Sequence, residues 1–319
     1  SARANGFTVV GPAVVSNAAA VAGSFNPTIF GYFGGGNPGP VSTVDRIDYS
    51  NDTATASPKG PLSLARYGVG GTSNSLFGYF GGGYPAKSTV DRIDYSNDTE
   101  TATAKGPLSV ARGLGLGATG NASFGYFGGG HPGPYSTVDR IDYSNDTATA
   151  AVKGPLSLAR YGIAATGNQS FGYFGGGPSL STVDRIDYTN DTGTTPSKGP
   201  LSLARFNLAA TGNTDFGYFG GGEPSVKSTV DRIDYSNDTA TASPKGPLSL
   251  ARRGLAATGN ADFGYFGGGV SSGFPNYYST VDRIDYSNDT ADASPKGPLS
   301  DAKSYFGGAI SSAANGLPQ

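Results

Sequence analysis

The heptapeptide Phe-Gly-Tyr-Phe-Gly-Gly-Gly decides the fold of this chain, because it occurs six times at almost constant spacing. The copies begin at Phe30, Phe77, Phe124, Phe171, Phe216 and Phe263. The steps between them are 47, 47, 47, 45 and 47 residues. A fixed period of this length indicates a stack or ring of equal units, each burying its apolar face against its neighbours. The repeat therefore predicts one ring-like domain for all 319 residues.

A single repeat contains four segments with the composition of short β-strands. In the second unit, small residues over 68–72 precede an aromatic segment over 76–80 that ends in glycines. Residues 88–95 alternate β-branched or aromatic side chains with charges, and residues 100–104 form a weaker fourth segment. Four antiparallel strands per repeat are typical of a propeller blade. We expect an all-β, six-bladed β-propeller with small residues at the axis and aromatic residues between blades. A β-solenoid is the alternative, although its coils are usually shorter.

The two ends of the chain supply one strand more than six blades need. Residues 18–23 match an inner strand before the first repeat, and residues 304–310 stand where another inner strand would begin. We therefore divide the chain into an N-terminal arm or closure segment (1–24), the propeller (25–303), and a closing strand with a tail (304–319). If the C-terminal segment closes the ring, the arm is left to add to the sheet edge of a neighbouring molecule. Local packing of both ends as extra edge strands is the alternative.

The composition argues against nucleic acids, membranes and thiolate-bound metals as partners of this chain. A net charge of -2 and 14% charged residues do not favour binding to nucleic acid or to an anionic membrane. The absence of cysteine excludes disulfides and thiolate metal sites. No run of about 18 apolar residues is present, so we expect no insertion into a membrane.

Residues capable of catalysis are few. The single histidine, His131, lies in a variable loop, so neither a Ser-His-Asp nor a Cys-His arrangement can form. The carboxylates Asp45 and Asp48 stand beside Arg46, and the same pattern recurs in all six units. A structural lattice of salt bridges and hydrogen bonds is favoured over an acid pair, because no repeat breaks the symmetry with a special acid or nucleophile. We expect no catalytic residues and interpret the chain as non-enzymatic, with a carbohydrate-active enzyme as a minor alternative.

Two repeated motifs resemble ligand sites, and both favour structural roles. The glycine triplets end a strand and are not followed by Lys-Ser/Thr, so they are not phosphate loops. They suit positive φ and close approach of the backbone. The Asn-Asp-Thr tripeptides match glycosylation acceptors, yet their composition is also that of a good turn, which we favour. Calcium at Asp48, Asn51 and Asp52 is a weaker alternative, because the spacing misses known calcium loops. We expect no metal and no cofactor.

The repeat resembles the kelch motif. The matching elements are the Gly81-Gly82 doublet after a strand, Tyr95 on the next strand, and Gly106-Pro107 with Arg112 before the following repeat. The resemblance covers nearly the whole chain and implies a propeller that binds through the loops of one face. The family usually carries a tryptophan after the tyrosine. This chain has none, so we expect a lightly packed outer strand. The equivalent slots hold Ala56, Ala102, Ala150, Thr195, Ala242 and Ala293.

The sequence of the repeat, GYFGGG followed by STVDRIDYSNDT and GPLSLAR, also looks like repeats in virion proteins of marine bacteriophages. This resemblance implies a viral structural protein that decorates a capsid or tail, forms part of a tail fibre, or serves in host attachment. The expected location is then the virion or the extracellular space. The alternative is a cellular or secreted kelch-type module for protein–protein interaction.

The copies differ in the loops that follow the glycine triplets. These loops are residues 37–41, 84–87, 131–135, 178–180, 223–227 and 270–278. In a propeller they emerge on one face, and aromatic side chains on a rigid scaffold suit contacts with protein or sugar. We therefore predict a ligand-binding set in these loops, with free drift of exposed loops as the alternative. The set is Tyr84, His131, Tyr135, Phe274, Tyr277 and Tyr278. The expected partners are other virion proteins, further copies joined through terminal strands, or a host surface glycan or protein.

Overall fold

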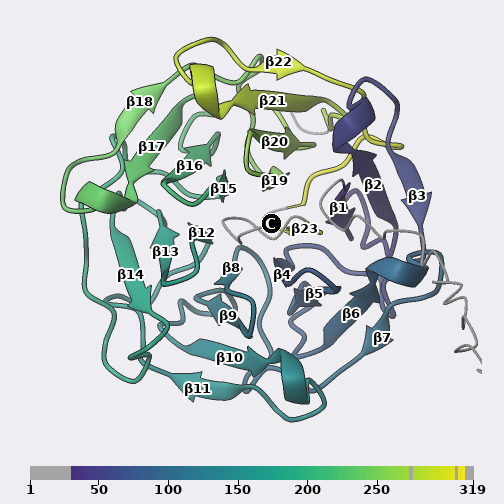
Figure 1. The fold of residues 1–319 in the computed structure, drawn as a ribbon, viewed down its shortest axis with the longest axis vertical. Coiled ribbons are helices and arrows are strands. Elements are labelled where there is room, and N and C mark those ends of the chain that lie inside the picture. Colours follow the sequence, from purple (N-terminus) through teal and green to yellow (C-terminus); the bar gives the residue numbers. More distant parts are fainter. Residues whose placement is uncertain (1–29, 273–275, 306–307, 313–319) are drawn as a thin grey trace, which may run out of the picture.

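Six antiparallel sheets surround one central axis in the computed structural model, which describes residues 30–272, 276–305 and 308–312 (Figure 1). Each sheet is one blade, and its strands follow one another from the axis to the rim. The prediction of an all-β, six-bladed propeller is confirmed. Among the described residues, no helix is long and apolar enough to cross a membrane. The proposed arm over residues 1–24 lies outside the described residues.

The strands fall into four concentric sets. The inner strands are β4 (Gly70–Ser73), β8 (Gly117–Gly120), β12 (Ala164–Gly167), β15 (Ala209–Gly212), β19 (Ala256–Gly259) and β23 (Ala309–Ser311). The second strands are β1 (Phe30–Gly34), β5 (Phe77–Gly81), β9 (Phe124–Gly128), β13 (Phe171–Gly175), β16 (Phe216–Gly220) and β20 (Phe263–Gly267). The third strands are β2 (Val44–Asp48), β6 (Val90–Asp94), β10 (Val138–Asp142), β14 (Val183–Asp187), β17 (Val230–Asp234) and β21 (Val281–Asp285).

The outer strands are the shortest, and they complete five of the six blades. They are β3 (Ser57–Lys59), β7 (Thr103–Ala104), β11 (Ala151–Lys153), β18 (Ser243–Lys245) and β22 (Ser294–Pro295). In the fourth blade, a single bridge between Asp184 and Ser197 occupies this position. One-turn 3₁₀ helices follow five of the third strands. They are η1 (Tyr49–Asn51), η2 (Tyr95–Asn97), η3 (Tyr143–Asn145), η4 (Tyr235–Asn237) and η5 (Tyr286–Asn288).

The first blade combines strands from both ends of the described chain. Its order is β23-β1-β2-β3, and β23 pairs antiparallel with β1, with Ala309 opposite Phe33 and Ser311 opposite Gly31. The innermost position of this blade is thus filled by a C-terminal segment, next to the axis (Figure 1). We number the blades from this one, so that β4–β7 form blade 2 and β19–β22 form blade 6.

The repeated heptapeptide is conserved among the copies because it builds the contact between blades. A Cβ atom added to Gly34 would lie only 2.8 Å from the ring of Phe80 in the next blade, so that ring requires glycine there. The same contact closes the circle, because a Cβ on Gly267 would lie 2.6 Å from the Phe33 ring. Both phenylalanines are fully buried. Aromatic packing between blades therefore accounts for the expected placement of these side chains.

A carboxylate at each blade interface collects three donors from the preceding blade. Asp98 in blade 2 accepts hydrogen bonds from Tyr32 Oη at 3.0 Å and Arg46 Nη1 at 2.7 Å, and Lys59 Nζ lies 3.5 Å away. The pattern recurs at every interface, and we call these acceptors the bridging aspartates. They are Asp52, Asp98, Asp146, Asp191, Asp238 and Asp289. Asp52 receives its donors from blade 6, so the same contact closes the ring.

A second ion pair lies at each interface, and at five of the six it is completely buried. Arg66 Nη1 lies 2.9 Å from Asp91 Oδ2, and Ser63 Oγ donates to the other oxygen at 2.6 Å. Equivalent pairs are Arg112–Asp139, Arg160–Asp184, Arg205–Asp231 and Arg252–Asp282. At the ring closure lysine replaces arginine, and Lys303 Nζ lies 3.5 Å from Asp45 Oδ2. The expected salt-bridge lattice is therefore present, but Asp45, Arg46 and Asp48 do not pair with one another.

Two rings of tyrosines stack across the interfaces. Tyr32 in β1 stacks on Tyr95 of the next blade with a centroid distance of 5.2 Å, and five equivalent pairs follow around the ring. The hydroxyl groups of the second ring reach the inner strands, as in the 2.8 Å contact between Tyr143 Oη and Thr72 Oγ1. Burial is the main cause that raises the pKa of Tyr95 and Tyr143 above the ordinary value.

Removing one bridging carboxylate is expected to weaken a single interface. Asp98→Ala leaves Tyr32, Arg46 and Lys59 without their shared acceptor, so we expect a loss of about 3 kcal/mol in the free energy of unfolding. Asp94→Asn is the control, because Asp94 only caps the neighbouring turn by accepting from Ser96. It should cost about 1 kcal/mol or less. Equal losses for the two variants in urea unfolding would contradict the bridging role.

The tyrosine rings predict an alkaline unfolding transition. In the unfolded chain, tyrosine ionises near pH 10.0, whereas burial raises the pKa of residues such as Tyr95 and Tyr188 well above it. This stabilisation is complete below pH 10.0 and is lost as the pH rises toward the folded-state pKa. We expect most tyrosinate absorbance to appear in the same step in which the β-sheet circular dichroism disappears. Full ionisation near pH 10.0 with an unchanged dichroism spectrum would contradict this linkage.

Candidate functional site

The six variable loops lie on one face of the ring, which we call the loop face. Each loop follows the end of a second strand and is joined to the segment that leads to the next inner strand. In blade 1, for example, Leu62 N donates to Ser42 O at 2.8 Å and Arg66 N donates to Val41 O at 3.0 Å. The 3₁₀ helices and the hairpins between inner and second strands lie on the opposite face, which we call the turn face (Figure 1).

Three tyrosines and an asparagine from three different blades meet on the loop face, and we call them the tyrosine cluster. The rings of Tyr67 and Tyr84 lie 5.1 Å apart between centroids. Asn37 Nδ2 donates to Tyr277 Oη at 2.9 Å. The pKa of Tyr67 is raised above the ordinary value, first by desolvation and then by the nearby hydroxyls of Tyr84 and Tyr277. Two predicted residues, Tyr84 and Tyr277, are thus brought together through Tyr67.

An aromatic arc crosses the middle blades of the same face. His131 contacts Tyr161 edge to face at 5.4 Å, and Tyr161 contacts Phe206 at 6.5 Å. All three side chains are half-buried. The arc consists of His131, Tyr161 and Phe206, and it joins an ionic group beyond Phe206. Its aromatic edges and faces can recognise apolar or sugar surfaces.

The ionic group contains Glu223, Asn207 and Arg253. Asn207 Nδ2 donates to Glu223 Oε1 at 2.6 Å, and Arg253 Nη1 donates to both oxygens of the same carboxylate at 2.9 and 3.0 Å. The carboxylate therefore has its charge compensated within the face. Backbone bonds between Phe206 and Glu223 fix this group to the arc.

Two further predicted residues, Tyr135 and Tyr278, make other contacts. Tyr135 forms a backbone bridge with Arg160, and Tyr278 Oη donates to Ser271 Oγ at 3.2 Å. Phe274 lies outside the described residues. Of the predicted residues that the structure describes, Tyr84 is the most exposed, with 44% of its surface accessible.

The sequence analysis missed one tyrosine of the tyrosine cluster, two members of the aromatic arc and the arginine of the ionic group. Tyr67, Tyr161, Phe206 and Arg253 all occupy the position directly after the buried arginine or its equivalent. Each contacts a residue of a variable loop, either through an antiparallel backbone bridge or through its ring. The signal was available, because this position also differs among the copies. This variation was overlooked because the position directly follows the strongly repeated Leu-Ala-Arg segment.

A series of four backbone hydrogen bonds links neighbouring blades along the inner margin of the loop face. Gly68 N donates to Tyr305 O, Tyr305 N to Gly254 O, Gly254 N to Asn207 O, and Asn207 N to Gly162 O, at 2.7–2.9 Å. Asn207 has φ of 54°, where four blades place glycine, and asparagine is among the residues that tolerate this conformation best. Four of the bonded residues directly follow Tyr67, Tyr161, Phe206 and Arg253 in the sequence.

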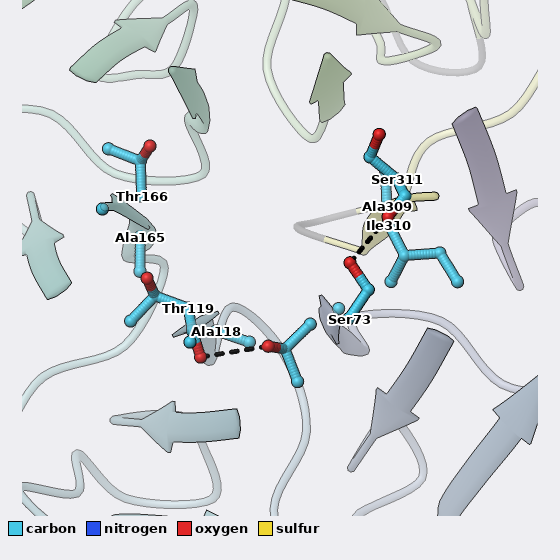
Figure 2. Close-up of a pocket in the computed structure, with 12 residues that line it drawn as sticks. Ser73, Ala118, Thr119, Ala165, Thr166, Ala309, Ile310 and Ser311 are labelled. Atoms are coloured by element: carbon cyan, nitrogen blue, oxygen red, sulfur yellow. Dashed lines mark hydrogen bonds between the residues drawn. The ribbon is translucent and has the colours of Figure 1, made fainter. Parts of the chain in front are cut away.

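A small cavity lies at the central axis between the described inner strands. Its volume is about 40 Å³, and it is lined by Thr72, Thr119 and Thr166 together with residues of β23 (Figure 2). Beside it, two hydrogen bonds join neighbouring inner strands: Ser73 Oγ donates to Ser311 O at 2.8 Å, and Thr72 Oγ1 donates to Thr119 O at 3.1 Å. The cavity has room for a few water molecules but not for a sugar or nucleotide.

The residues considered for calcium are engaged within the protein. Asp48 Oδ1 accepts from Ser50 N and Oγ at 2.8 and 2.6 Å, and Asp52 is a bridging aspartate. Within the described ranges, no group of three or more His, Cys, Asp or Glu residues is placed to hold a metal ion.

No protein-family model matches this chain, and no curated protein sequence matches it. Among solved structures, 686 chains match. One of them, titled "Structure of YjhT", aligns with a TM-score of 0.63 and 13% identity over 76% of this chain and 87% of that chain. At this identity the likeness shows the fold alone. It places the chain in the class of β-propellers, a fold that hosts many unrelated functions, so function has to be argued from the loop face.

The tyrosine cluster makes a measurable prediction about Tyr67. Tyr84→Ala removes the ring that covers Tyr67, so we expect the pKa of Tyr67 to fall toward the ordinary value of 10.0. An NMR titration with isotope-labelled tyrosine rings measures it. Tyr135→Ala is the control and should leave the Tyr67 pKa unchanged. An identical Tyr67 pKa in Tyr84→Ala and the parent protein would show that the cluster does not form.

Proposed function

We propose that this protein is a non-enzymatic structural or adhesion propeller of a phage-type virion. It would decorate a capsid or tail, or form part of a fibre, and bind a host surface glycan or protein through the loop face. The resemblance of the repeats to kelch motifs and to phage virion repeats supports this proposal. The propeller fold is compatible with it.

The observation that carries the proposal is the contrast between scaffold and loop face. The repeated ionic groups are engaged at blade interfaces, as Asp98 and Arg66 illustrate. Residues that differ among the copies instead form the tyrosine cluster and the aromatic arc on the loop face, where their rings contact one another. A rigid support with unequal aromatic side chains on one face is suited to recognition of a macromolecule.

The chemistry of the face supports binding rather than catalysis. His131 is the one histidine of the chain, and its ring contacts Tyr161. Glu223 is held by Arg253 and Asn207. A general acid–base mechanism needs a titratable pair aimed at a reacting group, and these contacts use the available groups for structure instead.

Binding experiments with loop-face variants test the adhesive role. A glycan array and intact host cells are probed with the parent protein and with the Tyr67→Ala/Tyr84→Ala/Tyr277→Ala variant. We expect at least a ~10-fold loss of apparent affinity, because clustered aromatic residues dominate such contacts. Val152→Ser on β11 is the control and should bind normally, since Val152 lies on the outer strand with 62% exposure. Equal binding by the triple variant would contradict the assignment of the face.

Detection of the protein in purified virions tests the viral part of the proposal. Its presence there, without binding to any glycan or host cell, would support decoration and contradict adhesion. Its absence from virions would overturn the viral role and favour the cellular or secreted interaction module.

A further inference from the structure

Exposed aliphatic side chains recur at one position of the repeat, two residues before the buried arginine. We call them the aliphatic ring. They are Leu64, Val110, Leu158, Leu203 and Leu250, with exposed fractions of 45%, 37%, 49%, 46% and 36%. The sixth equivalent position holds Asp301, whose side chain is 70% exposed. The ring therefore has five apolar members and one charged gap.

Backbone contacts place the aliphatic ring on the loop face. Leu64 stands between two residues that are bonded to the loop of the same blade, Leu62 and Arg66. The same two bonds flank the other members, for example from Leu201 N to Ser181 O and from Arg205 N to Leu180 O around Leu203. The chain runs here from an outer to an inner strand. The aliphatic side chains therefore lie farther from the axis than the tyrosine cluster and the arc, which they surround.

The exposed apolar surface of the described residues is concentrated on this face. Eight large apolar side chains are exposed among the described residues. Six of them, the aliphatic ring and Tyr84, lie on the loop face. The other two are separated from it, with Leu76 on the turn face and Val152 on an outer strand. Single exposed aliphatic residues are ordinary, but a concentration on one face indicates a contact with another protein surface.

Charged residues that are not common to all the repeats are distributed differently on the two faces. On the loop face, Lys87 and Lys227 are accompanied by Asp301, while Glu223 and Arg253 compensate each other. Both signs are therefore present in near balance. The turn face instead carries only acidic additions, and none of them forms an ion pair in the described part of the chain. These are Glu100, Asp215, Asp262 and Asp292. Two loop faces can approach without strong repulsion, whereas two turn faces repel.

We propose that the loop faces of two copies of this chain pack against each other in a two-fold symmetric dimer. A ring of equivalent aliphatic side chains is complementary to its own reversed copy, as a two-fold interface requires. The mixed charges of the face permit this pairing. In a head-to-tail stack, the aliphatic ring would instead meet the polar, acidic turn face. The two-fold arrangement is therefore the one that buries apolar surface against apolar surface.

This inference rests on the structural part of the proposed function. A loop face covered by a second copy is closed to a host ligand, so the dimer favours decoration over adhesion. The two ideas fail separately, because self-association needs no ligand and glycan binding needs no dimer. A monomer that binds host cells would support adhesion and overturn the dimer.

Analytical ultracentrifugation of the full chain over about 1 to 100 μM tests the proposal. We expect a monomer–dimer equilibrium. The variant Leu64→Ser/Leu158→Ser/Leu203→Ser should raise the dissociation constant at least ~10-fold. The control is Leu76→Ser/Val152→Ser, which removes even more exposed aliphatic side chains away from the loop face and should leave dimerisation unchanged. Circular dichroism verifies that both variants keep the parent fold, as expected for exposed positions.

Four results would overturn the proposal. They are a monomer at every concentration, open-ended growth typical of head-to-tail stacking, an unchanged dimer in the aliphatic-ring variant, and dissociation of the control variant.

Discussion

The structure depends on one carboxylate per blade that joins its own blade to the preceding one. Each bridging aspartate takes a tyrosine hydroxyl, a guanidinium and an ammonium group from the neighbouring blade, as Asp98 does with Tyr32, Arg46 and Lys59. These carboxylates are nearly buried, so losing any donor would leave charge poorly compensated. The contact is repeated around the ring, and the donors from blade 6 to Asp52 give the last interface the same bridging contact as the others.

The bridging carboxylate holds neighbouring blades close together, and the other contacts of the interface fit between them. The Phe80 ring requires Gly34 opposite it, and the stacked pair Tyr32–Tyr95 fills the space beside the bridging carboxylate. Buried Arg66 and Asp91 form a second connection near the loop face. Apolar packing and ionic contacts thus lie in the same interface, which explains why so much of the repeat is invariant among the copies.

The sequence predicted the fold well because a period of 47 residues and alternating side chains are local signals. It predicted the lattice but not its partners. Asp45 and Arg46 are adjacent in sequence, yet successive side chains of a strand point to opposite faces, so Arg46 reaches Asp98 and Asp45 meets Lys303. The candidate face was predicted only in part. Tyr84 and Tyr277 stood in variable loops, whereas Tyr67 reaches them because of the path between an outer and an inner strand. No local pattern reports that proximity.

The closure of the ring gives a nearly symmetric molecule a fixed point of reference. Lys303 stands in place of a buried arginine, and Ile310 stands opposite Tyr32, whereas the other five blades place threonine opposite the equivalent tyrosine. The longest variable loop and Asp301 lie beside the same junction. Five interfaces are chemically alike, whereas the sixth differs from them by Lys303 and Ile310. A surface that contacts the loop face can therefore distinguish one of six rotations, so an assembly built from this ring has a defined azimuth rather than six interchangeable settings.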